Sequence, residues 1–104
     1  MPDYQLGKIY VIHNSENENK YYSSTTLALR QRLYNHRSAC RNQKKKSKFY
    51  TAMREIGIEK FRIELVEERP CNSKQDLEKT EAEFIQNNRE FSYNMRVPKI
   101  INFQ

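Results

Sequence analysis

Five side chains form the set in this sequence best suited to chemistry: Tyr10, Tyr21, Arg32, His36 and Glu81. A tyrosine hydroxyl can orient or deprotonate a water molecule, and a histidine can relay a proton. An arginine can stabilise negative charge that develops on a phosphate, and a carboxylate can hold a divalent cation. We therefore expect this set to serve phosphodiester hydrolysis.

Glu81 also has an ordinary structural interpretation. It lies on the apolar side of a predicted helix, four residues from Leu77 and four from Ile85. A carboxylate in that position is unfavourable unless it is paired or binds a cation. The alternative is that Glu81 lies at the margin of the apolar stripe and points to water, with Thr80 turned inward.

The other four side chains have structural alternatives as well. Arg32 and His36 are four residues apart, so they share one face of a predicted helix, which could simply be solvated. Tyr10 and Tyr21 lie on neighbouring strands of a predicted hairpin. They could present their hydroxyls together or make ordinary cross-strand aromatic contacts.

The positive charge of the chain is concentrated in one segment. The net charge is +6, and residues 19–54 contain ten of the nineteen Lys and Arg residues but no Asp or Glu. A one-sided positive field indicates a polyanionic partner, most simply nucleic acid. The alternative for residues 43–48 (QKKKSK) is a solubilising loop. The candidate phosphate contacts are Lys20, Arg30, Arg37, Arg41, Lys44, Lys45, Lys46 and Lys48.

Length and composition narrow the class of protein. A chain of 104 residues predicts one domain over residues 1–104, and its periodic apolar residues argue against disorder. We see no membrane span and no signal peptide. Cys40 and Cys71 with two histidines form no zinc pattern, so we expect reduced thiols in an intracellular compartment, cytoplasmic or nuclear.

Six elements are expected to position the candidate residues. They are strands over residues 7–13 and 20–24, helices over 27–42 and 47–57, a strand over 59–68 and a helix over 73–88. We expect a Ser or Thr among residues 24–26 to cap the first helix, and Ser47 and Ser73 to cap the others. The last strand should bury Phe61, Ile63 and Leu65 on one face. The order β-β-α-α-β-α predicts an α+β fold, with a small, mainly antiparallel three-stranded sheet flanked by helices.

Short motifs follow one another in a fixed order along residues 7–94. They are Lys8-Ile9-Tyr10, Tyr21-Tyr22-Ser23, the spacing of Leu29, Arg32 and His36, residues 49–68, residues 77–85 (LEKTEAEFI) and Tyr93-Asn94. This ordered set resembles the GIY-YIG nuclease family over nearly the whole chain. Two positions depart from the family pattern, because Lys8 and Ser23 replace glycines. A hairpin should tolerate Lys8, whereas Ser23 is expected to crowd the site or lower activity.

The resemblance implies a metal-dependent DNA endonuclease. Tyr10 would activate or position the attacking water, helped by Arg32 or the metal because a tyrosine has an ordinary pKa of about 10. Tyr21 would hydrogen-bond the phosphate or the water. Arg32 would neutralise charge on the scissile phosphate. His36 would act as a phosphate contact or proton relay.

The resemblance also implies a metal site. Glu81 would be the only protein ligand of one Mg²⁺ or Mn²⁺, because Mg²⁺ keeps most of its waters. Asn94 would orient Glu81 or the phosphate from the second shell of the site. The expected partner is DNA, with no membrane and no small-molecule cofactor, bound by a monomer or a DNA-induced dimer.

Two other functions remain open. The chain could be a catalytically weak or inactive GIY-YIG-like module that only binds nucleic acid, an alternative that Ser23 supports. It could also be an unrelated small basic domain that binds RNA or DNA, although the order of the motifs argues against this.

Overall fold

The computed structural model describes residues 3–90 and 92–94, and its elements follow the expected order. The strands are β1 (Lys8–Asn14), β2 (Tyr21–Thr25) and β3 (Phe61–Glu68). The α-helices are α1 (Leu29–Cys40), α2 (Lys48–Ile56) and α3 (Lys74–Asn87). Short 3-10 helices cover η1 (Tyr4–Leu6) and η2 (Ile58–Lys60).

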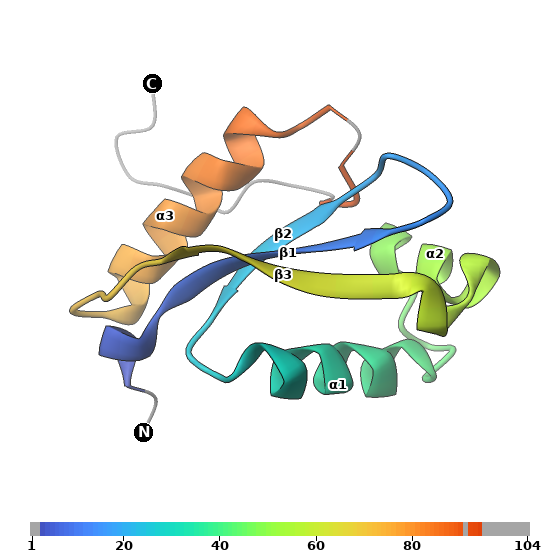
Figure 1. Cartoon of the computed structure of the whole chain (residues 1–104), viewed down its shortest axis with the longest axis horizontal. Coiled ribbons are helices and arrows are strands. Elements are labelled where there is room, and N and C mark those ends of the chain that lie inside the picture. Colours follow the sequence, from blue (N-terminus) through green and yellow to red (C-terminus); the bar gives the residue numbers. More distant parts are fainter. Residues whose placement is uncertain (1–2, 91, 95–104) are drawn as a thin grey trace.

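The three strands form one antiparallel sheet in the order β2-β1-β3. Helix α3 lies on one face of this sheet and α1 on the other, with α2 beside the end of the sheet near the last turn of α1 (Figure 1). The predicted α+β class and three-stranded sheet are confirmed. The sheet therefore has two covered faces, and its strands carry side chains alternately to each.

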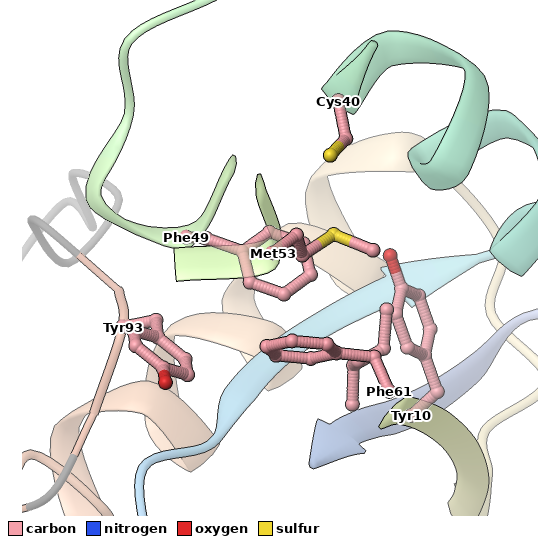
Figure 2. Packing of buried hydrophobic residues seen from close by; sticks show 7 residues of the cluster. Tyr10, Cys40, Phe49, Met53, Phe61 and Tyr93 are labelled. Carbon is pink, nitrogen blue, oxygen red and sulfur yellow. The ribbon is translucent and has the colours of Figure 1, made fainter. Parts of the chain in front are cut away.

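The larger core lies between the sheet and the helices α1 and α2. Tyr10 of β1 is fully buried there with Phe49 and Met53 of α2 and Phe61 of β3 (Figure 2). The smaller core, around Ile9, lies against α3. Since neighbouring residues of a strand point to opposite faces, this division places the side chains of β2 as well.

The register of the sheet decides which β2 side chains accompany Tyr10. Ser23 is paired with Tyr10, and Tyr21 with Ile12, so both point toward the larger core. Tyr22 is paired with Val11 and points to the α3 side. The separation of Tyr21 from Tyr22 follows from the alternation of side chains along a strand.

Two of the three predicted helix caps are confirmed. The Ser47 side chain accepts a hydrogen bond from the Tyr50 N–H at 3.2 Å, and Ser73 accepts one from the Asp76 N–H at 3.2 Å. Gly57 ends α2 with φ of +123°, a conformation that favours glycine.

The predicted start of the first helix is wrong. Helix α1 begins at Leu29 with Ala28 before it, and no side chain caps its first turn. Thr25 instead accepts a hydrogen bond from the Leu27 N–H at 3.0 Å and so stabilises the preceding turn. Ser24 is engaged elsewhere, with a carboxylate on α3.

The prediction for the last strand is wrong at one end. Phe61 is buried and Ile63 half-buried, but Leu65 is 48% exposed. β3 is an edge strand, and α1 reaches it at its start, where the Arg37 side chain donates to the Phe61 carbonyl at 3.3 Å. Alternation along a strand predicts which residues share a face. Whether those residues are buried depends on whether another element packs on that face.

Two further expectations concern the chain as a whole. Within residues 3–90 and 92–94, no helix has the length and apolar character needed to cross a membrane. Cys40 and Cys71 are both free and buried, and burial raises the pKa of each thiol. Both thiols are therefore held in the protonated, less reactive form.

Candidate active site

The Tyr10 hydroxyl lies at the centre of the candidate site. It is 2.7 Å from Nε2 of His36, and Arg32 donates its Nε–H to the same oxygen at 3.1 Å. Arg32 and His36 lie one turn apart on the face of α1 that packs against the sheet, and His36 is only 2% exposed. The interpretation of this pair as a solvated face therefore does not hold for His36.

The second tyrosine, Tyr21, comes from β2 and lies against His36. Its ring stacks on Phe49 with centroids 4.2 Å apart, and the edge contact with the His36 ring has a centroid distance of 5.5 Å. Burial raises the pKa of Tyr21, and the negative charge of Glu81 raises it further. Tyr21 is thus a neutral hydroxyl packed at the rim of the aromatic core.

Burial controls the protonation of the two groups at the centre of the site. It raises the pKa of Tyr10 above its ordinary value, and the positive charge of Arg32 opposes that shift. Burial, followed by the charge of Arg32, lowers the pKa of His36 to about 4. His36 is consequently a neutral imidazole at physiological pH, with one N–H donor and one acceptor nitrogen.

Both ring nitrogens of His36 have a tyrosine partner. Nε2 meets Tyr10, and Nδ1 is 3.0 Å from the hydroxyl of Tyr50 on α2. This arrangement leaves no nitrogen for the expected alternative role of phosphate contact. Sequence reasoning missed Tyr50, which stands outside every spacing used, because only tertiary packing brings α2 to this histidine.

Glu81 projects from α3 toward the end of β2. Its Oε1 accepts hydrogen bonds from the hydroxyls of Ser23 at 3.2 Å and Ser24 at 2.5 Å. Glu81 is half-buried, and its neighbour Thr80 is buried and bonds the Asp76 carbonyl within the helix. Thr80 is thus turned inward, as the structural alternative required, but Glu81 meets the two serines.

Ser23, expected from the resemblance to stand in place of a glycine, lies beside the candidate site on β2. It is 8% exposed and lies opposite Tyr10 in the sheet, on the same face. Hydrogen bonding with Ser23 lowers the pKa of both Tyr10 and Tyr21, against the larger effect of burial. The serine hydroxyl therefore connects the tyrosines with the carboxylate of Glu81.

A groove of about 460 Å³ opens beside these residues. Arg32 and Glu81 both line it, with Ser23 and Ser24 between them along β2. Lys74, in the first turn of α3, also lines the groove, and sequence reasoning missed it. The signal was available, because Lys74 lies seven residues before Glu81 and so on the same face of a helix.

Two carboxylates line the groove, Glu78 and Glu81, and Glu81 is the one that Ser23 and Ser24 hold in place as a candidate ligand for a hard cation. Both hydrogen bonds to Glu81 end on Oε1, so Oε2 is the atom that we expect to face a cation. Among the residues that the structure describes, no three His, Cys, Asp or Glu side chains form a cluster that could hold a metal. A Mg²⁺ ion would therefore keep most of its waters and take the remaining ligand from the substrate.

Asn94 binds the exposed edge of β2. Its side-chain oxygen accepts from the Tyr22 N–H at 2.9 Å, and its amide donates to the Tyr22 carbonyl at 2.8 Å. Ser92 also donates to the Asn94 side chain. Asn94 therefore reaches Glu81 only indirectly, through the strand that carries Ser23 and Ser24.

The candidate phosphate contacts lie outside the groove. Lys20 precedes β2, Arg30 and Arg41 are exposed at the two ends of α1, and residues 44–46 are exposed in the loop before α2. Lys48 donates to the Ser92 carbonyl at 3.4 Å. Arg37 is half-buried and turned to the backbone of β3, so it is the least available of the set.

Comparison with known proteins yields one match. The family model described as the GIY-YIG catalytic domain matches residues 6–94, nearly the whole chain. Neither the curated proteins nor the solved structures contain a match to this chain. The matched residues include all the side chains that meet in the site, from Tyr10 on β1 to Asn94.

Proposed function

This chain belongs to the GIY-YIG catalytic domain family, and on that premise we propose that it is a divalent-metal-dependent DNA endonuclease. The family supplies a nuclease fold and a nucleic acid as substrate. The observation that carries the finer proposal is that Arg32, already bonded to the Tyr10 hydroxyl, lines the same groove as Glu81. Arg32 thus connects the buried Tyr10 hydroxyl with the groove that Glu81 lines, which supports roles as base, phosphate-binding cation and metal ligand for the three residues.

The chain's own residues divide the reaction between them. Arg32 binds the scissile phosphate and neutralises the charge that develops on it. Tyr10 takes a proton from the attacking water as general base. Burial raises the pKa of Tyr10, and the Arg32 guanidinium beside it offsets part of that rise. Tyr21 orients the water or the phosphate through its hydroxyl. A divalent cation held by Glu81 would supply charge neutralisation at the phosphate and leaving oxygens.

Plasmid cleavage in Mg²⁺ tests the proposal. We expect the wild type to nick or cut plasmid DNA, and Glu81→Gln to lose at least about a hundredfold in rate because the amide is a poor metal ligand. Arg32→Ala should lose a similar factor. Glu83→Gln, an exposed neighbour on the same helix, is the matched control and should cut at the wild-type rate.

The outcomes separate the proposed function from the binding-only alternative. A wild type that binds DNA but cuts no duplex, nicked, branched or single-stranded form with Mg²⁺ or Mn²⁺ would establish binding without catalysis. Equal rates for the wild type and Glu81→Gln would remove Glu81 from the metal site. Circular dichroism of each variant keeps loss of folding apart from loss of chemistry.

A further inference from the structure

We propose that Tyr50 is a positioning residue that holds His36 in the Nε2–H tautomer, so that His36 donates a hydrogen bond to the Tyr10 oxygen. The proposal rests on the proposed function in one respect, that Tyr10 is the base of the reaction. It adds a residue from α2, an element whose side chains do not line the groove. Tyr50 would act through His36 and does not touch the substrate.

The geometry places three groups in a line. The Tyr50 hydroxyl lies 3.0 Å from Nδ1 of His36, and Nε2 of the same ring lies 2.7 Å from the Tyr10 oxygen. The imidazole is 2% exposed, and aromatic rings enclose it, including Phe49 at a centroid distance of 5.4 Å. Tyr50 is therefore the group that decides what Nδ1 does.

Hydrogen-bond inventory couples the tautomer of His36 to the direction of the Tyr50 hydroxyl. A neutral imidazole donates from one nitrogen and accepts at the other, so the proton at one end fixes the role of the other end. If the Tyr50 O–H donates to Nδ1, the proton sits on Nε2 and points at Tyr10. The Tyr10 oxygen then receives two N–H donors, from His36 and from Arg32 at 3.1 Å. Its own O–H is left to point toward Ser23 and the groove.

Two donors on one phenol oxygen suit a tyrosinate. Burial disfavours the anion of Tyr10, and each N–H directed at the oxygen offsets part of that effect. The opposite tautomer would do the reverse, because Nε2 would accept the Tyr10 proton and hold it on the phenol. Tyr50 therefore favours the state of His36 that helps Tyr10 act as a base.

Several other groups face this centre and must be counted in any pH dependence. From β1 there is Tyr10 itself, from β2 Tyr21 and Ser23, and from α1 Arg32. From α2 there is Tyr50, whose own pKa is raised by burial, and from α3 Glu81 acts on Tyr21. Substituting Tyr50 alone leaves all the others in place.

The first test is nitrogen NMR of the His36 ring in the DNA-free protein, wild type and Tyr50→Phe. We expect the wild type to show the Nε2–H tautomer, with Nδ1 as the unprotonated nitrogen. In Tyr50→Phe a share of Nδ1–H should appear, because the Tyr10 O–H can then donate to Nε2. A wild type in the Nδ1–H form would overturn the proposal, and so would a tautomer ratio unchanged by Tyr50→Phe. This readout does not depend on nuclease activity.

The second test is the pH profile of cleavage. In Tyr50→Phe, part of the His36 population no longer donates its Nε2–H to the Tyr10 oxygen, and this loss raises the pKa of Tyr10. We therefore expect kcat of Tyr50→Phe to fall about tenfold near pH 7, with KM for DNA within about twofold. Burial holds the pKa of Tyr10 above its ordinary value in both proteins, so the deficit should be the same at every pH from about 6 to 9. An unchanged kcat, or a rise in KM that accounts for the whole loss of kcat/KM, would overturn the proposal. Tyr34→Phe makes the same change on an α1 tyrosine that is 64% exposed, and should match the wild type.

The two tests keep the proposals apart. If the wild type cuts no DNA, the proposed function fails, and the tautomer measurement still decides whether Tyr50 sets the state of His36. If the wild type cuts DNA but Tyr50→Phe leaves both the tautomer and kcat unchanged, the nuclease stands and the role of Tyr50 fails.

Discussion

Ser23 stands where the GIY-YIG resemblance leads us to expect a glycine, and its hydroxyl contacts the carboxylate of Glu81. Its Oγ donates to Glu81 at 3.2 Å, while its hydrogen bonding favours the ionised forms of Tyr10 and Tyr21. A glycine at this position would leave that volume to a water molecule. The serine therefore replaces a solvent contact with a fixed one, and need not abolish activity.

Substituting Ser23 tests this interpretation. We expect Ser23→Ala to lower kcat about tenfold, because a methyl group leaves the Tyr10 hydroxyl and Glu81 each short of one partner. Ser23→Gly should lose less, because a water can take the place of the hydroxyl. Cleavage rates measured across pH 6–9 compare the three proteins. An alanine variant as fast as the wild type would contradict a role for the hydroxyl.

His36 predicts a second effect, on stability. Its pKa is about 4 in the folded chain and about 6.5 when exposed, so the unfolded chain binds more protons between these values. The folded protein should therefore lose stability as pH falls from about 6.5 to 4, by about 3 kcal/mol from this group. Urea unfolding of the wild type and His36→Gln at pH 7 and pH 4 measures the difference.

Gln31→Ala, at an exposed position of the same helix, is the control for that experiment, because it changes no ionisable side chain. Carboxylates contribute a pH slope common to all three proteins, so the comparison isolates His36. The slope of His36→Gln should be flatter than that of the wild type, and the slope of Gln31→Ala should match the wild type. Equal slopes for the wild type and His36→Gln would show that His36 is not buried neutral.

At this scale, sequence spacing identified most of the residues that meet in the site. Tyr10, Arg32, His36 and Glu81 were accessible because helical and strand periods place them on defined faces. Tyr50 was not, because nothing along the chain indicates which side of α2 reaches α1. Hydrogen-bond partners are set by tertiary packing, and a period carries no information about them.

Among the elements, α1 separates the groove from the lysine loop, defined here as residues 41–47. Twelve helical residues span about 18 Å, which corresponds to roughly five base pairs of duplex. The groove adjoins the start of this helix, and the lysine loop follows its end (Figure 1). A duplex cut at the groove could therefore contact the loop about half a helical turn away.

The double variant Lys45→Ala/Lys46→Ala tests contact between the loop and the DNA backbone. We expect weaker binding to every sequence, and a salt slope of log K that is smaller by about two, because two phosphate contacts release their counterions. Lys60→Ala/Lys79→Ala removes the same charge outside the loop and should change the slope less. A loss confined to one DNA sequence would contradict backbone contact.

The ends of elements show where local rules suffice. The caps Ser47 and Ser73 could be predicted because each side chain satisfies the N–H groups of its own helix start. The start of α1 was mispredicted because Ser24 is bonded to Glu81, about 57 residues along the chain, and not to its own backbone. A cap is predictable only when no distant partner competes for it.

For the molecule as a whole, the site lies where three layers meet. The sheet supplies Tyr10 and Ser23, one covering helix supplies Arg32 and His36, and the opposite helix supplies Glu81 (Figure 1). The Glu81 side chain extends from α3 to β2, where its carboxylate accepts hydrogen bonds from Ser23 and Ser24. The fold class could be predicted from the order of the elements. The contact between Glu81 and the β2 serines could not, because it depends on where α3 lies over β2, and no single segment of the sequence specifies that position.

Asn94 links the segment 92–94 to this arrangement and gives the last prediction. The Asn94 side chain takes the place of a neighbouring strand, because its oxygen accepts from the Tyr22 N–H and its NH₂ donates to the Tyr22 carbonyl. Tyr22 is the residue before Ser23. Asn94→Ala leaves these groups without that partner, so we expect the free energy of unfolding to fall by about 1–3 kcal/mol. If β2 then shifts under Glu81, kcat should fall severalfold with KM little changed. Thermal melts and cleavage rates test both effects, with Asn72→Ala, an exposed loop residue, as control. A stability loss without a change in kcat would confine Asn94 to holding the strand, and unchanged stability would contradict its role as a partner of β2.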